Sequence, residues 1–153
     1  MALQGPIVLV EDDHNDAEVI TAAIHEIGIP NKIQVLHDAR EAFDYLMQTD
    51  EQPFVILCDI RMPLMDGLSF RKNICENEFL RKKSIPFVFY TGLVSQEMVN
   101  EAYDMDVQGF YLKAKSYEGV KDQLQSILRY WSQCLHPNRD LGDDIRQIKR
   151  PNS

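Results

Sequence analysis

Five short apolar runs, separated by longer amphipathic segments, constrain the fold of this chain more than any other feature of its sequence. The runs cover residues 7–10, 33–36, 54–58, 87–90 and 110–112. They are shorter than a typical helix, and their nearly unbroken apolar character is typical of strands with both faces covered, as in a parallel sheet. We therefore predict five strands in one parallel sheet.

The segments between the runs have the spacing of amphipathic helices. In the first of them Ile20, Ile24 and Ile27 share one face, and Gly28 follows as a C-terminal cap would. Three further segments begin with residues suited to capping a helix N-terminus, namely Asp38, Ser95 and Ser116. Residues 66–76 form one more predicted helix. Five strands alternating with five helices predict a doubly wound α/β domain with helices on both faces of the sheet.

We predict that this domain covers residues 1–132 and that residues 133–153 form a C-terminal tail. Pro, Asn and Gly cluster at residues 136–142 and indicate a break in regular structure. Beyond the break, three apolar residues have helical spacing: Leu141, Ile145 and Ile148. We expect a frayed end of the chain there, with a short docking helix as the alternative.

Charge and cysteine content narrow the classes of function. The chain has 16 Lys and Arg against 24 Asp and Glu, a net charge of −8, and this sign disfavours the attraction to phosphates on which nucleic-acid binding depends. Cys58, Cys75 and Cys134 match no zinc or redox spacing, so we expect inert thiols in a reducing compartment. There is no signal-peptide pattern, and no segment has the ~20 apolar residues that span a bilayer. We expect a cytoplasmic protein that binds neither nucleic acid nor membrane.

Chemically active side chains follow the ends of four predicted strands. They are Glu11, Asp12 and Asp13 after the first strand, Asp59 after the third, Thr91 after the fourth and Lys113 after the fifth. Ligands of open parallel sheets bind at the carboxyl ends of the strands, so we expect these groups to meet there. Clustered carboxylates repel one another unless a cation neutralises them, and Mg²⁺, which prefers oxygen ligands, is the cofactor that we predict.

A buried strand that runs directly into a carboxylate holds that group rigidly. Asp59 is therefore placed to act as a nucleophile in phosphoryl transfer, with Lys113 holding a phosphoryl oxygen and Thr91 donating a hydrogen bond to the product. Asp13 is expected to cap the following helix instead. Each of these residues alone is an ordinary strand-end or turn residue, and their order and spacing together carry the prediction.

Four motifs at these strand ends resemble the receiver domain of bacterial two-component response regulators, a family that includes the chemotaxis regulator. The motifs are "VLVEDD", "CDIRMPLMDG", "FYTG" and "GFYLK", and the resemblance covers residues 1–132. It implies a flavodoxin-like fold with strand order 2-1-3-4-5. It also implies a signalling switch that accepts a phosphoryl group on Asp59 from a sensor histidine kinase or a histidine phosphotransfer protein. Such a domain catalyses only its own phosphorylation and dephosphorylation, so we do not expect an enzyme for other substrates.

The resemblance further implies roles for individual residues. Thr91 and Lys113 would hold the phosphoryl group. Mg²⁺ would be held by the side chains of Glu11, Asp12 and Asp59 and by the backbone carbonyl of Arg61. Phe110 stands at the aromatic switch position, where the ring turns inward as Thr91 moves, and the surface of the fourth helix, fifth strand and fifth helix would then repack.

Two departures from the family pattern leave details open. Ala114 stands where the family usually has a proline preceded by a cis bond, and a cis bond before a non-proline residue costs ~3 kcal/mol, so we expect a strained or rearranged loop. Arg61 and Leu93 occupy variable positions that tend to set the lifetime of the phosphoryl group in this family.

Three other interpretations compete with this one. A haloacid-dehalogenase-like phosphatase needs a second aspartate two residues after the nucleophile, where Arg61 stands. A calcium-binding EF-hand would need a glycine and a terminal glutamate that "EDDHNDAEV" lacks. A phosphorylation-independent pseudo-receiver that acts only as a binding module stays open.

The output of the switch is less constrained than its chemistry. The predicted domain leaves no room for a DNA-binding or catalytic domain within this sequence, so we expect signalling through protein contacts with an unknown downstream protein, or phosphorelay. The long last helix and the tail resemble those of regulators that partner bacterial phytochromes, which leaves a homodimer open.

Overall fold

Five parallel strands form the central sheet of the computed structural model, which describes residues 4–136. The strands are β1 (Ile7–Val10), β2 (Ile33–Leu36), β3 (Val55–Cys58), β4 (Phe87–Thr91) and β5 (Gly109–Leu112). Their order is β2-β1-β3-β4-β5, and all four pairings are parallel. The predicted doubly wound fold and strand order are confirmed, and no strand boundary differs from the prediction by more than one residue.

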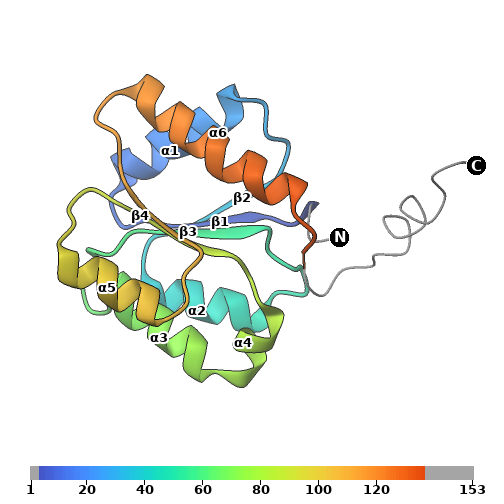
Figure 1. The fold of residues 1–153 in the computed structure, drawn as a ribbon. Coiled ribbons are helices and arrows are strands. Elements are labelled where there is room, and N and C mark those ends of the chain that lie inside the picture. The colour runs from blue at the N-terminus through green and yellow to red at the C-terminus, as the bar shows by residue number, and fades with distance from the viewer. Residues whose placement is uncertain (1–3, 137–153) are drawn as a thin grey trace, which may run out of the picture.

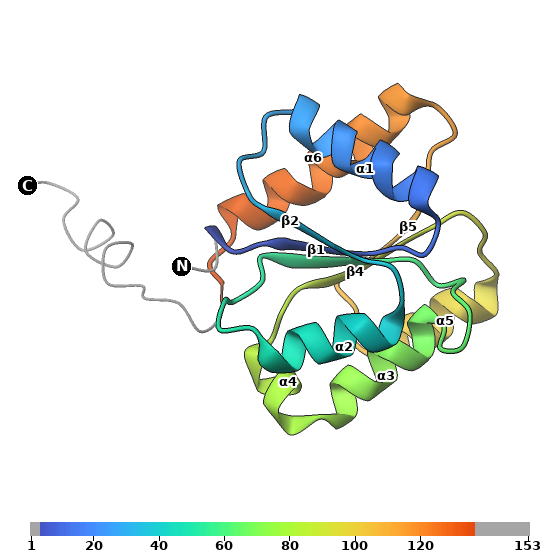
Figure 2. The same ribbon diagram turned by 180° about the vertical axis from the view of Figure 1, so that it is seen from behind.

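Helices cover both faces of the sheet, as Figures 1 and 2 show from opposite sides. One face carries α1 (His14–Glu26) and α6 (Tyr117–Gln133). The other carries α2 (Ala39–Gln48), α3 (Gly67–Glu76), α4 (Glu78–Lys83) and α5 (Gln96–Asp104). Among these helices none combines the length and the apolarity that crossing a bilayer requires.

The prediction of five helices was wrong, because residues 4–136 contain six. Asn77 ends α3 and also caps α4, where its side chain accepts a hydrogen bond from the backbone N–H of Leu80 at 3.0 Å. The six residues of α4 bury only Leu80, so this helix is too short to show an amphipathic period. The predicted fourth and fifth helices correspond to α5 and α6.

Side-chain caps begin the helices where the sequence predicts them. The four predicted caps each accept a hydrogen bond from the backbone N–H three residues later: Asp13, Asp38, Ser95 and Ser116. Gly28 follows α1 with φ of +82°, a left-handed conformation in which glycine meets no Cβ penalty. These local signals fix where the helices start and stop, and therefore how long the connections to the strands are.

Two apolar layers pack against the sheet because successive side chains of a strand point to opposite faces. Val8, Val10 and Ile56 join the layer under α2, α3 and α5, whereas Ile7 and Leu9 join the layer under α1 and α6. The central strands β1, β3 and β4 are buried throughout, and the edge strands β2 and β5 are mostly half-buried. Burial therefore concentrates on the three strands that have a neighbour on each side.

The last described residues turn back onto the domain. His136 is 4% exposed, and its ring stacks on Phe54 with a centroid distance of 5.2 Å and contacts Trp131 edge-on at 5.9 Å. The predicted frayed end of the chain, and its alternative of a short docking helix at Leu141, Ile145 and Ile148, lie outside the described residues. The predicted domain boundary after residue 132 stays a prediction.

Gly67 provides a stability test at the junction of β3 and α3. A Cβ at this position would lie 2.2 Å from the carbonyl oxygen of Asp59 and 2.9 Å from the Cα of Ile60, both of them backbone atoms. We expect Gly67→Ala to lower the free energy of unfolding by about 1–3 kcal/mol, as overpacking does. Urea unfolding followed by circular dichroism measures the change.

Gly92→Ala is the matched control, because a Cβ there would meet nothing within 4 Å. Its unfolding free energy should stay within about 0.5 kcal/mol of the wild type. Equal destabilisation by the two substitutions would contradict the close packing at Gly67.

Candidate functional site

Asp59 lies at the carboxyl end of the sheet, directly after β3. Its backbone N–H donates to the carbonyl of Val10 at 2.9 Å, so the pairing of β3 with β1 continues into this residue. The side chain is 11% exposed. Its Oδ1 accepts hydrogen bonds from the N–H of Ile60 at 2.8 Å and from the hydroxyl of Thr91 at 2.6 Å. The sheet therefore holds this carboxylate in one orientation, with Oδ1 fully engaged.

Three carboxylates meet beside Asp59, as the sequence predicts. The side-chain oxygens of Glu11, Asp12 and Asp59 lie within 4.8 Å of one another. Glu11 is 1% exposed, and Asp12 is half-buried. Such a set of hard oxygen donors, gathered where burial disfavours negative charge, fits a divalent cation such as Mg²⁺.

Lys113 places a positive charge beside the three carboxylates. Its backbone N–H donates to the carbonyl of Thr91 at 2.8 Å, so β5 places it at the same edge. Its ammonium donates a hydrogen bond to Glu11 and lies 3.0 Å from Asp16 Oδ2 and 3.8 Å from Asp59 Oδ2. Lys113 therefore binds Glu11 and Asp16 more closely than it binds Asp59.

Burial and charge shift the titration of this pair. Burial, together with the neighbouring Asp59, raises the pKa of Glu11 to about 8 against the opposing effect of the hydrogen bond from Lys113. Burial alone would lower the pKa of Lys113, but its hydrogen bond with Glu11 and the negative charge of Glu11 and Asp59 outweigh burial and leave that pKa above its ordinary value. The site thus favours any bound positive charge.

Asp16 is a site residue that the sequence analysis missed. It lies in the first turn of α1, where its carboxylate contacts Lys113, and its backbone N–H donates to the capping side chain of Asp13 at 3.0 Å. The available signal was its position three residues after a predicted cap, because the first turn of that helix starts at the same sheet edge. Asp13 itself is the exposed cap that was predicted.

Phe110 and Arg61 have surroundings that agree with the sequence analysis without testing their roles. Phe110 is half-buried in β5, and its ring lies 5.6 Å from that of Phe89 on the α5 side of the sheet. The Arg61 side chain is exposed in the loop after Asp59. The switch role of Phe110 and the metal-binding role of the Arg61 carbonyl stay predictions.

The loop after Lys113 is rearranged relative to the arrangement that the family resemblance implies. Within residues 4–136 no peptide bond is cis, so the chain passes from Lys113 to Ala114 through a trans bond. The N–H of Ala114, which a proline would lack, donates to the side chain of Gln123 at 3.0 Å.

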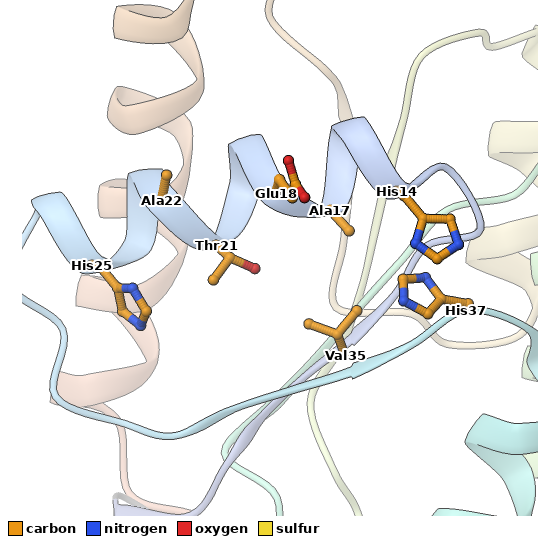
Figure 3. A pocket seen from close by; sticks show the side chains of 8 residues that line it. All are labelled: His14, Ala17, Glu18, Thr21, Ala22, His25, Val35 and His37. Carbon is orange, nitrogen blue, oxygen red and sulfur yellow. The ribbon is translucent and has the colours of Figure 1, made fainter.

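A separate hollow of about 410 Å³ lies between α1 and β2 (Figure 3). His14 and His37 face each other at its end, with stacked rings whose centroids are 4.0 Å apart, whereas His25 points into the opposite end. His37 Nδ1 lies 3.0 Å from the backbone oxygen of Glu11. Of the described residues, only the three carboxylates Glu11, Asp12 and Asp59 gather as a metal site does, and none of their side chains lines this hollow.

The family model of the response regulator receiver domain matches residues 7–125. The chain belongs to the receiver-domain family of response regulators. The probable methanogenesis regulatory protein FilR2 of Methanothrix harundinacea is 33% identical to this receiver domain over 140 residues, which cover 89% of this chain and 87% of FilR2. The response regulator Rcp1 of Synechocystis is 26% identical over 84% of this chain and 90% of Rcp1.

Solved structures confirm the receiver fold. The phosphorylated cyanobacterial phytochrome response regulator RcpA has a TM-score of 0.80 at 24% identity, over 88% of this chain and 99% of that chain. The Mn²⁺-bound form of Rcp1 has a TM-score of 0.75 at 24% identity, over 87% of this chain and 99% of that chain. At these identities the two structures establish the fold of this receiver domain and nothing further.

The effect of Mg²⁺ on stability tests the candidate metal site of this receiver domain. Mg²⁺ at about 100 times its dissociation constant should raise the free energy of unfolding by about 2.7 kcal/mol, because it binds only the folded cluster. Asp12→Asn should remove most of this gain. Thermal and urea unfolding with and without MgCl₂ measure it.

Asp13→Asn provides the matched control. It removes the same charge one residue away, and asparagine caps a helix as well as aspartate does. This variant should keep the wild-type gain from Mg²⁺. An equal gain in Asp12→Asn, or none in the wild type, would contradict the assigned cluster.

Proposed function

We propose that this receiver domain is a cytoplasmic, phosphorylation-activated switch of a two-component system, with Asp59 as the phosphoryl acceptor. The observation that carries the proposal is the environment of the Asp59 carboxylate, whose two oxygens have different partners. Thr91 and the Ile60 N–H occupy Oδ1 of Asp59, while Oδ2 faces the ammonium of Lys113 at 3.8 Å. Hydrogen bonds thus orient one oxygen and leave the other to react.

The proposed reaction follows from the different partners of the two Asp59 oxygens. Oδ2 of Asp59 attacks the phosphorus of a phosphohistidine on the kinase or phosphotransfer protein, a P–O bond forms, and the P–N bond to the imidazole breaks. Lys113 and Thr91 then hold oxygens of the transferred group, where negative charge gathers. Glu11, Asp12, Asp59 and the Arg61 carbonyl would hold Mg²⁺, which would supply charge that neutralises the transferred group. The domain modifies itself and turns over no other substrate.

Two observations support Mg²⁺ as the cofactor. The three carboxylates supply only oxygen atoms, which is the donor set that Mg²⁺ prefers. Rcp1, which is similar in sequence to this chain, has been crystallised with Mn²⁺, a divalent cation that accepts the same oxygen ligands.

The proposed switch couples Asp59 to a distant surface through Thr91 and Phe110. Phosphorylation adds about 1 to 2 negative charges beside the Thr91 hydroxyl, which now donates to Asp59. We expect Thr91 to follow the phosphoryl group and the half-buried ring of Phe110 to turn into the space it leaves. The surface of α5, β5 and α6 then repacks, and it carries exposed aromatic side chains at Tyr103 and Tyr130.

Intact mass after incubation with acetyl phosphate and Mg²⁺ tests the acceptor. Wild-type protein should gain the mass of one phosphoryl group, and Asp59→Asn should gain none, because an amide is not a nucleophile for this transfer. Asp66→Asn is the matched control: Asp66 is an exposed cap of α3 in the same connection, so this variant should be modified like the wild type. No gain in the wild type would leave a pseudo-receiver that acts by binding alone.

Self-association tests the output surface. We expect phosphorylation to promote a homodimer through α5, β5 and α6, and light scattering after size exclusion should then show a doubled mass. Tyr130→Glu should prevent dimerisation because it places a charge on an exposed aromatic residue of α6. Phe79→Glu also replaces an exposed aromatic residue with a charged one, but on α4, and the protein with this change should dimerise normally. Equal behaviour of the two variants would contradict this choice of surface.

A further inference from the structure

One side chain of α6 holds the main chain on both sides of Lys113. The amide nitrogen Nε2 of Gln123 donates to the carbonyl of Leu112 at 2.8 Å, and Oε1 accepts from the N–H of Ala114 at 3.0 Å. Between these two bonds, the N–H of Lys113 donates to the carbonyl of Thr91 at 2.8 Å. Three consecutive residues are therefore tied down at the point where the lysine leaves the sheet.

Tyr90 in turn holds the side chain of Gln123 in place. The hydroxyl of Tyr90 donates to Gln123 Oε1 at 2.6 Å. Tyr90 is buried in β4, immediately before Thr91, and burial raises the pKa of its hydroxyl to about 12, so it stays a donor. The amide thus links the end of β4, the end of β5 and the second turn of α6 into one unit.

The neighbouring helix turn is packed tightly on the same loop. A Cβ at Gly119, four residues before Gln123, would lie 2.7 Å from the Cβ of Ala114. Residue 114 also has to donate an N–H to Gln123, which proline is unable to do. Ala114 and Gln123 are therefore complementary, since residue 114 supplies the N–H that the Gln123 side chain accepts.

We propose that Gln123 is a positioning residue for phosphoryl transfer. It fixes the backbone on both sides of Lys113 and so sets where the lysine ammonium lies relative to Asp59. The inference rests on the proposed function of Asp59 and extends it to a residue that touches neither the carboxylate nor the metal ligands. The side chain of Lys113 is long enough for its ammonium to reach Glu11, Asp16 or Asp59. The position of the Lys113 backbone therefore affects which of these carboxylates the ammonium contacts most closely.

The rate constant for phosphorylation by acetyl phosphate at saturating Mg²⁺ tests the proposal. Gln123→Ala should lower it about tenfold, the size of effect expected when a supporting residue lets a reacting group shift by a fraction of an ångström. Gln125→Ala, an exposed glutamine on the same helix, should leave the rate unchanged. Calorimetry should give the same Mg²⁺ dissociation constant for all three proteins, because Glu11, Asp12 and Asp59 are untouched.

A double-mutant comparison separates positioning from a general structural role. In a Lys113→Ala background the further change Gln123→Ala should have no effect on the rate, because the group that it positions is gone. Tyr90→Phe keeps the volume of the ring and removes one bond to Gln123, so it should lower the rate about threefold, the equivalent of about 0.6 kcal/mol. Tyr90→Phe therefore tests the positioning role of Gln123 even if Gln123→Ala unfolds, and urea unfolding establishes which variants are folded.

The outcomes are distinct. A wild type that gains no phosphoryl group overturns the proposed function of Asp59 itself. A wild type that is phosphorylated, with Gln123→Ala or Tyr90→Phe reacting as fast, overturns the positioning role alone. A loss that persists unchanged in the Lys113→Ala background also overturns it, since the effect would then reach Asp59 by another route.

Discussion

The parallel register of the sheet is the constraint on which the rest of this molecule depends. Val10 pairs with Cys58, so Glu11 and Asp59 follow β1 and β3 at the same level. Cys58 pairs with Phe89 and Phe89 with Phe110, so Lys113 follows β5 at the same edge of the sheet, two residues beyond the level of Asp59. Because side chains alternate along a strand, a slip of one residue would turn Glu11, Asp59 and Lys113 to the opposite face and would bury the polar groups in the apolar layers. The hydrophobic pattern thus aligns the charged edge.

The acidic edge is held together at an electrostatic cost. Glu11 is almost fully buried beside two other carboxylates, and Lys113 is the ammonium that contacts it. Removing charge from water is unfavourable unless partners replace the solvent, which is why hydrogen bonds from Thr91 and from the backbone converge on Asp59. An edge that favours added positive charge and leaves one carboxylate oxygen without a hydrogen bond from Thr91 or the backbone suits the proposed transfer of a phosphoryl group to Asp59.

Local signals were sufficient for most of the fold. Short apolar runs located every strand to within one residue, and Asp13, Asp38, Ser95 and Ser116 cap the helices that they were predicted to cap. The sixth helix, α4, escaped prediction because its six residues bury a single leucine and carry no period. The edge strands are also less buried than their composition suggested, because each has a neighbour on one side only.

The sequence by itself determined which groups gather at the strand ends, since the order and spacing of Glu11, Asp12, Asp59, Thr91 and Lys113 follow from parallel strands that end together. It did not determine which of the carboxylates Glu11, Asp16 and Asp59 the Lys113 ammonium contacts most closely. Asp16 and Gln123 reach it or its backbone from positions in α1 and α6 that carry no motif, and Asp16 lies 97 positions away along the chain. Only the packing of α1 and α6 on one face of the sheet brings them there, because hydrogen bonds between distant segments depend on helix placement to within an ångström.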